Sequence, residues 1–213
     1  MINKIKKIKK DPLAYIFLKI REPFVFVYIF ICSIYTILLA WLKRINIKGV
    51  PRCHGVPYLM RNPNSSIHIG TDFLINSSFK SNNIGMFSRS RITTNYPNAI
   101  IEIGSHVGMS SVTISAFKKI VIGNNTLIGG NVLITDSDWH AIDPFARFHQ
   151  CEGSIKMADV VIGENVFIGT RSIILKGSII GNNSIIGAGS VVRGVIPANV
   201  IACGNPCKVI KQL

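Results

Sequence analysis

The sequence is poor in charged residues and poorest in acidic ones. Charged residues make up 16% of the 213 positions, and 10 aspartates and glutamates stand against 24 lysines and arginines, for a net charge of +14. Such an excess of basic residues raises nucleic acid as a partner. The sequence has no zinc-finger, homeodomain or RNA-binding signature, so we expect no nucleic-acid binding.

Cysteine is scarce, and its spacing matches no metal site. The five cysteines are Cys32, Cys53, Cys151, Cys203 and Cys207. An odd number in this arrangement predicts reduced cytosolic thiols that mostly pack, and no bound metal. None lies in a nucleophile context, so the sequence does not favour a covalent acyl-enzyme intermediate.

Charge is missing altogether from residues 23–42. Twenty helical residues span about 30 Å, the thickness of a hydrocarbon core. We expect no cleavable signal here, because the run is too long and no small-residue cleavage site ends it. Residues 1–60 are therefore predicted to be a basic, apolar, helical segment that associates with a membrane. The alternative is a helix packed on the protein or on a partner subunit.

Basic residues flank this run on both sides, and five of the lysines lie in residues 1–10. The positive-inside rule therefore selects no orientation. Such flanks suit anionic lipid head groups. We predict a peripheral or re-entrant helix on the cytoplasmic face of the inner membrane, with Pro12 and Pro23 at its entry. A cytoplasmic protein without membrane contact is the alternative.

The rest of the chain repeats with a period of six residues. Isoleucine or valine recurs at Ile162, Ile168, Ile174, Ile180, Ile186 and Val192. A small or β-branched residue follows four places later, as at Val166, Ser172, Ser178, Ser184 and Ser190. This period describes short strands and corners in stacked coils, with aliphatic side chains pointing inward and corner asparagines at positive φ. We predict an all-β parallel β-helix in residues 61–213, with regular coils from about Ile67 to Val200.

The six-residue frame breaks between Ile134 and Ile162. Residues 141–159 must leave the coils there, and we expect them to form the one loop excursion. Residues 80–100 are irregular and polar as well. Long loops on a rigid scaffold usually carry function.

These features match one family. The coils, the sequence TDSDWH before the excursion and the ending IGAGSVVRGVIPANVIACGNPCKVIK resemble the hexapeptide-repeat acyltransferases, with the galactoside, maltose and colanic-acid O-acetyltransferases as the most similar types. The resemblance covers about residues 65–211. It implies a left-handed β-helix, a homotrimer, and acetyl-coenzyme A bound in a groove between neighbouring subunits.

The resemblance also implies which residues contact the coenzyme. They are Thr170, Ala188, Arg193, Gly194, Lys208 and Lys211. The backbone N–H of Thr170 would meet the acyl group, and Gly194 departs from a lysine that the family often has. Ser110 and Ser111 fall where sugar O-acetyltransferases often place asparagines that line the acceptor pocket.

Acyl transfer to a hydroxyl needs a general base, and histidine can accept a proton at neutral pH. His140 occupies the place of the family's catalytic histidine, directly before the excursion. His149 within the loop is the second candidate, and the remaining histidines are expected at the surface or in structural roles: His54, His68 and His106. Either Asp136 or Asp138 could orient His140 or contact the acceptor, or both could satisfy their own backbone. Trp139 could stack on a sugar or pack.

The sequence therefore predicts an acetyl-coenzyme A-dependent O-acetyltransferase that uses no metal. Its acceptor would be a saccharide hydroxyl, free or lipid-linked, in the biosynthesis of a cell-surface polysaccharide such as a capsule, O-antigen or exopolysaccharide. An amino-sugar N-acetyltransferase of the same fold is the alternative. A zinc carbonic anhydrase and a non-catalytic trimerisation scaffold are further alternatives, the former needing three converging histidines.

Overall fold

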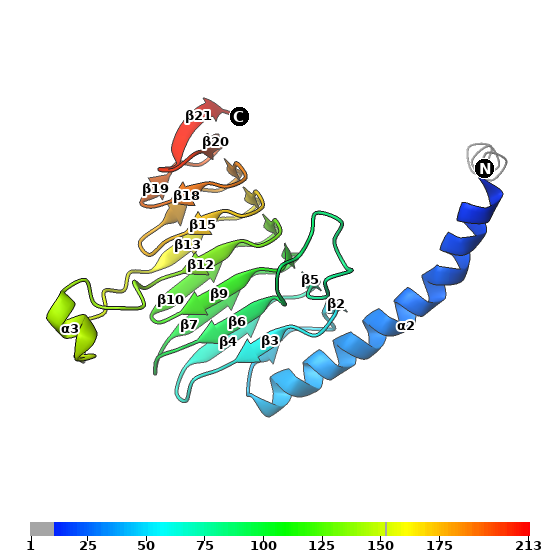
Figure 1. Ribbon diagram of the computed structural model, residues 1–213, viewed down its shortest axis with the longest axis horizontal. Coiled ribbons are helices and arrows are strands. Elements are labelled where there is room, and N and C mark those ends of the chain that lie inside the picture. The colour runs from blue at the N-terminus through cyan, green and yellow to red at the C-terminus, as the bar shows by residue number, and fades with distance from the viewer. Residues whose placement is uncertain (1–10, 152) are drawn as a thin grey trace.

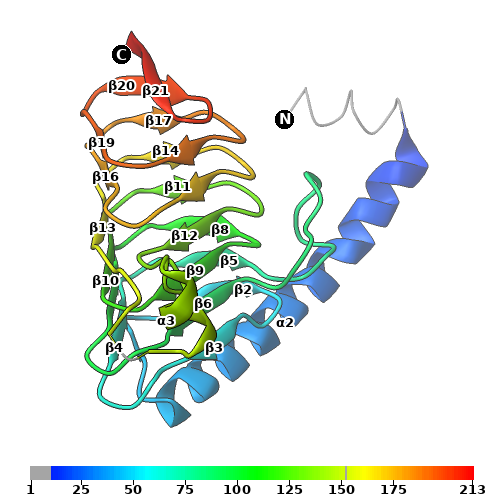
Figure 2. The same ribbon diagram turned by 60° about the vertical axis from the view of Figure 1, so that its left-hand side comes forward.

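A computed structural model describes residues 11–151 and 153–213, so the lysines predicted to face lipid in residues 1–10 lie outside the described residues. Within the described residues, short strands form three parallel sheets that wind into a stack of coils (Figures 1 and 2). The chain climbs this stack from the coil that contacts helix α2 to the C-terminus at the far end.

Each coil gives one strand to each sheet, except the last, which gives none to sheet C. Sheet A contains β1 (Asn46–Ile47), β4 (Ser66–Ile69), β7 (Ile100–Ile103), β10 (Lys119–Ile122), β13 (Val160–Ile162), β16 (Ile179–Ile180) and β19 (Val195–Ile196). Sheet B contains β2 (Arg52–His54), β5 (Leu74–Asn76), β8 (Gly108–Ser110), β11 (Leu127–Ile128), β14 (Phe167–Ile168), β17 (Ile185–Ile186), β20 (Val200–Cys203) and the antiparallel β21 (Lys208–Gln212). Sheet C contains β3 (Tyr58–Met60), β6 (Arg91–Thr94), β9 (Thr113–Ala116), β12 (Leu133–Thr135), β15 (Ile173–Ile174) and β18 (Val191–Val192).

The predicted inward positions form continuous aliphatic ladders. Ile162 pairs in register with Ile180, and Ile168 pairs with Ile186. All four side chains are at most 1% exposed. Burial of a side chain of this size stabilises the fold by about 1.5–3 kcal/mol. The prediction that every sixth residue points into the core is confirmed.

The small residues of the repeat point inward at the corners, where they link one coil to the next. The buried hydroxyl of Ser178 donates to the Val192 carbonyl over 3.0 Å. The Ser184 hydroxyl donates to the Pro197 carbonyl over 2.7 Å. A serine fits this position because it satisfies a carbonyl that a larger side chain would cover.

Asparagines at one set of corners adopt the left-handed conformation, as predicted. Asn165, Asn183 and Asn199 have φ values of 56°, 59° and 59°. Their side-chain amides stack, with Asn165 donating to Asn183 over 3.0 Å and Asn183 donating to Asn199 over 2.8 Å. Asparagine tolerates positive φ better than other non-glycine residues, and the stacked amides fix the spacing of the coils.

The β-helix begins earlier than the sequence indicates. The first coil, formed by β1, β2 and β3, lies on the N-terminal side of the boundary predicted at residue 60, and regular coils were expected only from about Ile67. Cys53 and Leu59 fill its inward positions and are 0% and 2% exposed. Because a cysteine and a leucine do not continue the isoleucine–glycine pattern, the six-residue period does not predict this coil.

Two loop excursions leave the described coils, where the sequence predicts one. The second excursion spans residues 136–159, somewhat longer than the predicted 141–159, and contains α3 (Pro144–Phe148). The first spans residues 77–90, within the region expected to be irregular, and β6 follows it directly. The all-β description is therefore approximate: α2 agrees with the predicted N-terminal helix, and α3 is a further short helix.

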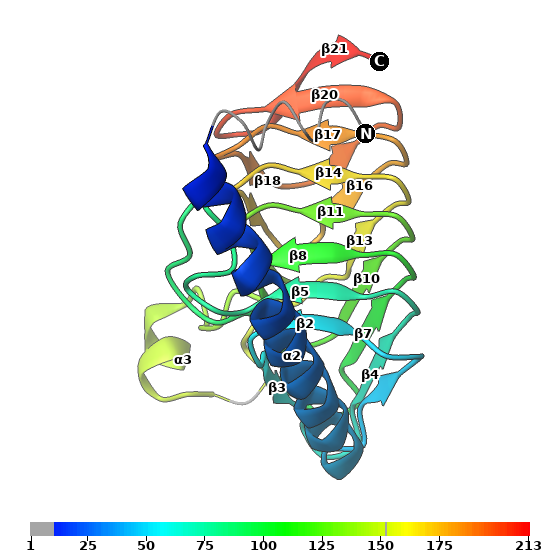
Figure 3. The same ribbon diagram turned by 90° about the vertical axis from the view of Figure 1, so that its right-hand side faces the viewer.

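Helix α2 (Pro12–Leu42) is 31 residues long and lies across the first coil (Figures 1 and 3). Asp11 caps its start by accepting from the Ala14 amide over 3.1 Å. Pro12 occupies the first turn as expected, but the helix continues through Pro23 instead of beginning there. The small side chains on one face pack against the coil: Cys32, Ser33, Thr36 and Ala40.

Candidate active site

The sheets meet at edges, and two of these edges hold the candidate residues. At the C–A edge the chain passes from sheet C to sheet A, and the 136–159 excursion leaves there after β12. At the B–C edge the chain passes from sheet B to sheet C, and the 77–90 excursion leaves there after β5. The two edges bound opposite sides of sheet C.

Aromatic side chains from successive coils stack along the C–A edge. The rings of Tyr96 and Phe117 lie 5.5 Å apart, and those of Phe117 and Trp139 lie 5.0 Å apart in an edge-to-face arrangement. The indole of Trp139 donates to the Thr135 hydroxyl over 3.1 Å. Trp139 therefore packs, and its remaining exposed surface faces an open cleft.

The cleft lies between this aromatic stack and α3, and it has a volume of about 810 Å³. His140 lines it together with Tyr96, Trp139 and Arg147. The His140 side chain is exposed, and its backbone N–H donates to the Asp138 carbonyl over 2.7 Å. This tight backbone turn presents the imidazole to the cleft at the start of the excursion.

Asp136 is fully buried and binds backbone amides. Its carboxylate accepts from the amides of Phe117 and Lys118, each over 2.7 Å. Burial raises the pKa of this carboxyl group, and the backbone hydrogen bonds oppose the shift. Both carboxylate oxygens thus tie the start of the excursion to the corner of the preceding coil.

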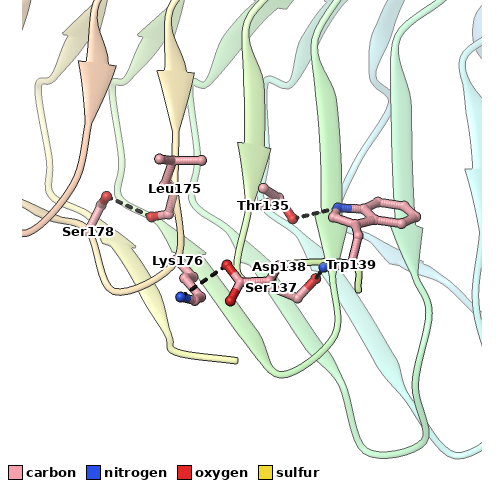
Figure 4. Close-up of polar contacts among 7 residues, drawn as sticks. All are labelled: Thr135, Ser137, Asp138, Trp139, Leu175, Lys176 and Ser178. Carbon is pink, nitrogen blue, oxygen red and sulfur yellow. Dashed lines mark hydrogen bonds and ion pairs between the residues drawn. The ribbon is translucent and has the colours of Figure 1, made fainter. Parts of the chain in front are cut away.

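Asp138 lies two residues before His140 and pairs with a lysine from the next coil (Figure 4). Its Oδ1 is 3.0 Å from Lys176 Nζ, and its buried Oδ2 has no hydrogen-bond partner among the described residues. Lys176 follows β15 at the same C–A edge. The sequence does not point to Lys176, because the excursion and part of a coil separate it from Asp138.

The other histidines do not line this cleft. The His149 ring stacks on Phe145 with centroids 4.0 Å apart, and its Nδ1 lies 2.9 Å from the Phe145 carbonyl oxygen. His106 lies beside Asp72 at the surface, and His68 is exposed. His54 is half-buried on β2. In the described part of the chain, no three histidine, cysteine, aspartate or glutamate side chains are placed to share a metal ion.

Ser110 and Ser111 lie at the other edge, where they hold the 77–90 excursion. The buried Ser110 hydroxyl accepts from Asn76 over 2.9 Å and from Asn82 over 3.0 Å. The buried Ser111 hydroxyl donates to the Ser88 carbonyl over 2.7 Å. Their hydroxyls are thus engaged within the chain.

The residues that the resemblance links to the coenzyme divide between the two edges. Thr170 and Ala188 follow β14 and β17 at the B–C edge, and Ala188 is exposed. Arg193 and Gly194 follow β18 at the C–A edge, two coils beyond the excursion that carries His140. The exposed strand β21 carries Lys208 and Lys211 at the end of sheet B.

Comparison with known proteins agrees with the repeat pattern. The family described as bacterial transferase hexapeptide (six repeats) matches residues 159–194. The galactoside O-acetyltransferase of Escherichia coli (strain K12) is 34% identical over 120 residues, which cover 55% of this chain and 59% of that protein. The polysialic acid O-acetyltransferase of Escherichia coli O1:K1 / APEC is 35% identical over 121 residues, which cover 57% of this chain and 38% of that protein.

A solved structure supports the fold. AntD, an N-acyltransferase from Bacillus cereus in complex with dTDP and 3-hydroxybutyryl-CoA, is similar with a TM-score of 0.55 and 19% identity, covering 82% of this chain and 87% of that one. The chain spans about half the length of the curated relatives it matches. The stacked six-residue coils, the matching repeat family and the O-acetyltransferase relatives together support the hexapeptide-repeat acetyltransferase family for this chain.

Proposed function

We propose that this protein is an acetyl-coenzyme A-dependent O-acetyltransferase that acts on a saccharide hydroxyl in the biosynthesis of a cell-surface polysaccharide. The observation that carries the proposal is His140, which lines an open cleft at the start of an excursion from hexapeptide coils. The acceptor class rests on relatives named for galactoside and polysialic acid acetylation.

In the proposed reaction the acceptor hydroxyl and the thioester meet beside His140 in one ternary complex. The His140 imidazole takes the hydroxyl proton as the oxygen attacks the acetyl carbon. A backbone N–H, proposed to be that of Thr170, stabilises the oxyanion of the tetrahedral intermediate. The intermediate then releases the coenzyme thiolate, and His140 returns the proton to it.

Asp138 is proposed to position His140 in this reaction. Lys176 holds one of its oxygens, which leaves the unpartnered Oδ2 as an acceptor for an imidazole N–H. Asp136 anchors the excursion through two backbone amides. Trp139 offers its exposed surface to the acceptor. Ser110 is proposed to act only indirectly, through the 77–90 excursion that it holds.

One chain does not bring all these groups together. His140 and Thr170 lie at opposite edges of sheet C, and a site that uses both needs a second copy. We therefore propose a homotrimer of left-handed β-helices, with the C–A edge of one subunit facing the B–C edge of its neighbour. In that arrangement Ala188, Lys208 and Lys211 would line the coenzyme groove beside the neighbour's excursion.

The membrane association predicted for the N-terminal segment is proposed to be interfacial. Among the described residues, α2 alone is long and apolar enough to cross a membrane. The face that carries Ser33 and Thr36 packs on the first coil, however, so lipid cannot surround this half of the helix. The remaining half carries Lys19, Arg21 and Glu22, which disfavour a span.

The face of α2 opposite the coil contact is apolar along the whole helix. It is formed by the exposed side chains of Leu13, Phe17, Ile20, Phe24, Val27, Ile31, Ile34, Leu38 and Trp41. A helix of this kind can lie in the membrane plane with that face in the lipid. We therefore propose that the protein lies on the cytoplasmic face of the inner membrane.

The activity is tested by incubating the purified full-length protein with radiolabelled acetyl-coenzyme A and isolated glycans, free and lipid-linked. We expect label in the glycan that mild alkali removes, as an ester requires. Alkali-stable label would show an amide and favour the N-acetyltransferase. If the protein neither transfers the acetyl group nor binds the coenzyme, only a structural role for it would remain.

Subunit sharing is tested by mixing two inactive variants. His140→Ala removes the base, and Ala188→Trp fills the coenzyme groove from an exposed position. Trimers assembled at random from equal amounts should recover activity at about a quarter of all sites, because random assembly pairs two intact halves at that frequency. Absence of recovery in verified mixed trimers would show that each subunit works alone.

A further inference from the structure

A second hollow lies between α2 and the 77–90 excursion, and the proposed reaction does not use it. It has a volume of about 470 Å³. It is lined by Arg21, Val25, Tyr28, His54, Ser78, Lys80 and Ser81. Figures 2 and 3 show the excursion standing beside the N-terminal half of α2, so the helix and the excursion form its two walls.

The charge in this hollow is of one sign. Arg21 enters from the helix and Lys80 from the excursion, and no aspartate or glutamate is among the described residues that line it. Glu22, the neighbour of Arg21, instead pairs with Lys19. A guanidinium and an ammonium group that line one hollow without a counter-charge suit a phosphate, which accepts several charge-assisted hydrogen bonds.

The hollow continues along the same helix into a groove that has aromatic and aliphatic side chains among its walls. A neighbouring cavity of about 450 Å³ shares Tyr28 and Ser78 with the first, and Tyr35, Leu39 and Phe79 also line it. Arg89 lines it too, but its guanidinium donates to the backbone carbonyls of Val56 and Pro57. A free phosphate ion would make no use of the aromatic and aliphatic side chains. A phosphate attached to a hydrocarbon chain would place its charge between Arg21 and Lys80 and its chain against the aromatic wall.

The place of Arg21 on the helix agrees with such a ligand. At 100° per residue, Arg21 lies on the flank of α2, between the face packed on the first coil and the apolar face that turns away from it. In an interfacial helix this flank lies at the level of the lipid head groups. The hollow therefore opens at the level where the phosphate groups of the lipid head groups lie.

We propose that the hollow binds the phosphate of an anionic lipid, with the lipid chain in the adjoining groove. This inference rests on the interfacial position of α2 within the proposed function and adds a specific lipid site to it. Bound lipid would join α2 to the 77–90 excursion, which Ser110 and Ser111 fasten to the coils. The site would thus fix the orientation of the β-helix relative to the membrane.

The test is flotation of the full-length protein with vesicles of phosphatidylcholine alone, or of phosphatidylcholine mixed with phosphatidic acid, a polyprenyl phosphate or oleate at equal surface charge. Arg21→Gln/Lys80→Gln removes the site. Arg44→Gln/Lys48→Gln is the matched control, because it removes two exposed charges outside the hollow. Acetylation of a soluble saccharide by each variant is measured in parallel.

We expect the intact protein to bind both phosphate lipids more tightly than oleate vesicles of the same charge. Arg21→Gln/Lys80→Gln should weaken that binding about tenfold or more, through the loss of two charged hydrogen-bonding groups, while the control stays within about twofold of the intact protein, since two surface charges remote from the ligand act weakly. Tighter binding to one of the two phosphate lipids identifies the source of the phosphate.

Three results would overturn the proposal: equal binding to oleate vesicles, equal loss in both variants, or equally tight binding of inorganic phosphate. The first two indicate surface charge alone, and the third indicates a free-phosphate site. Because flotation needs no catalysis, a protein that binds lipid but transfers no acetyl group would refute the proposed activity and leave the lipid site intact.

Discussion

Asp138 and Lys176 form an ion pair that joins the excursion carrying the candidate base to the coil beyond it. Asp138 Oδ1 lies 3.0 Å from Lys176 Nζ, and the two side chains are 28% and 23% exposed. The pair is thus neither fully buried nor free in solvent. It sits two residues from His140, and its second carboxylate oxygen is unpartnered among the described residues.

Replacing Lys176 with methionine is expected to destabilise the protein and reduce turnover, because Asp138 loses the cation that holds it. A double-mutant cycle with Asp138→Asn should give a coupling of about 1–2 kcal/mol, between the values for exposed and buried pairs. Urea unfolding at fixed protein concentration measures the coupling. Lys119→Met, which breaks the exposed pair with Glu102, is the control. Additive effects of the two substitutions would show that the contact carries no coupling.

Replacing His140 with alanine is expected to lower turnover by about 100-fold or more, the range for a lost general base. Coenzyme affinity, measured by calorimetry, should stay nearly unchanged because the imidazole is proposed to act on the acceptor hydroxyl and the leaving thiolate. His149→Ala is the matched control in the same excursion and should retain most activity. Normal turnover in the His140 variant would refute the assignment.

Replacing Asp136 with asparagine is expected to cost about 1–3 kcal/mol of unfolding free energy. The asparagine keeps one oxygen acceptor but turns its amide group toward the second of the two backbone N–H groups of Phe117 and Lys118. Thermal unfolding measures the loss, and the exposed Asp72→Asn variant should lose far less. Equal stability of the two variants would contradict a structural role for the Asp136 carboxylate.

His54 should make stability depend on pH. Burial, followed by the charge of Arg52, lowers the pKa of His54 below its usual 6.5. Below pH 6.5 the unfolded chain therefore binds more protons at this residue than the folded chain does. The stabilisation is complete above pH 6.5 and is lost as the pH falls through the lowered pKa.

The measurement is unfolding free energy from pH 8 down to about pH 5, the range in which a histidine near its usual pKa titrates. His54→Gln should flatten the curve below pH 6.5 relative to the intact protein. His149→Gln, a change at the exposed end of α3, serves as the comparison. If the unfolding free energy of the His54 variant falls with pH as steeply as that of the intact protein, another group controls the loss of stability at acidic pH.

The coils could be predicted because their chemistry is local and repeated. An inward isoleucine, a corner serine and a corner asparagine recur at fixed spacing, and each contacts its own equivalent in the next coil, as Ile162 contacts Ile180. The first coil lacks this local signal. Its core depends on Cys53 and on the small face of α2, two segments whose contact the pattern does not encode.

The candidate site could be predicted only in part for the same reason. The position of His140 at the start of an excursion follows from the break in the six-residue frame, and the residue lines a cleft there, while its catalytic role stays a prediction. The partners of Asp136 and Asp138 lie on neighbouring coils, so sequence spacing gave no reason to choose between the two carboxylates. The division of the residues proposed to bind the coenzyme between two edges becomes visible only once the strands are assigned to sheets.

Because successive coils are equivalent, distances along the β-helix axis can change in evolution by whole coils. Val161 pairs directly with Ile179 in the next coil. Removing one complete coil would therefore shift every later coil by about 4.8 Å and leave the strand pairing intact. The distance between His140 and the hairpin of β20 and β21 can therefore change only by multiples of the spacing between coils. Gain or loss of one coil would match this distance to a longer or shorter acyl donor, without any change in the loop that carries His140 or in the hairpin.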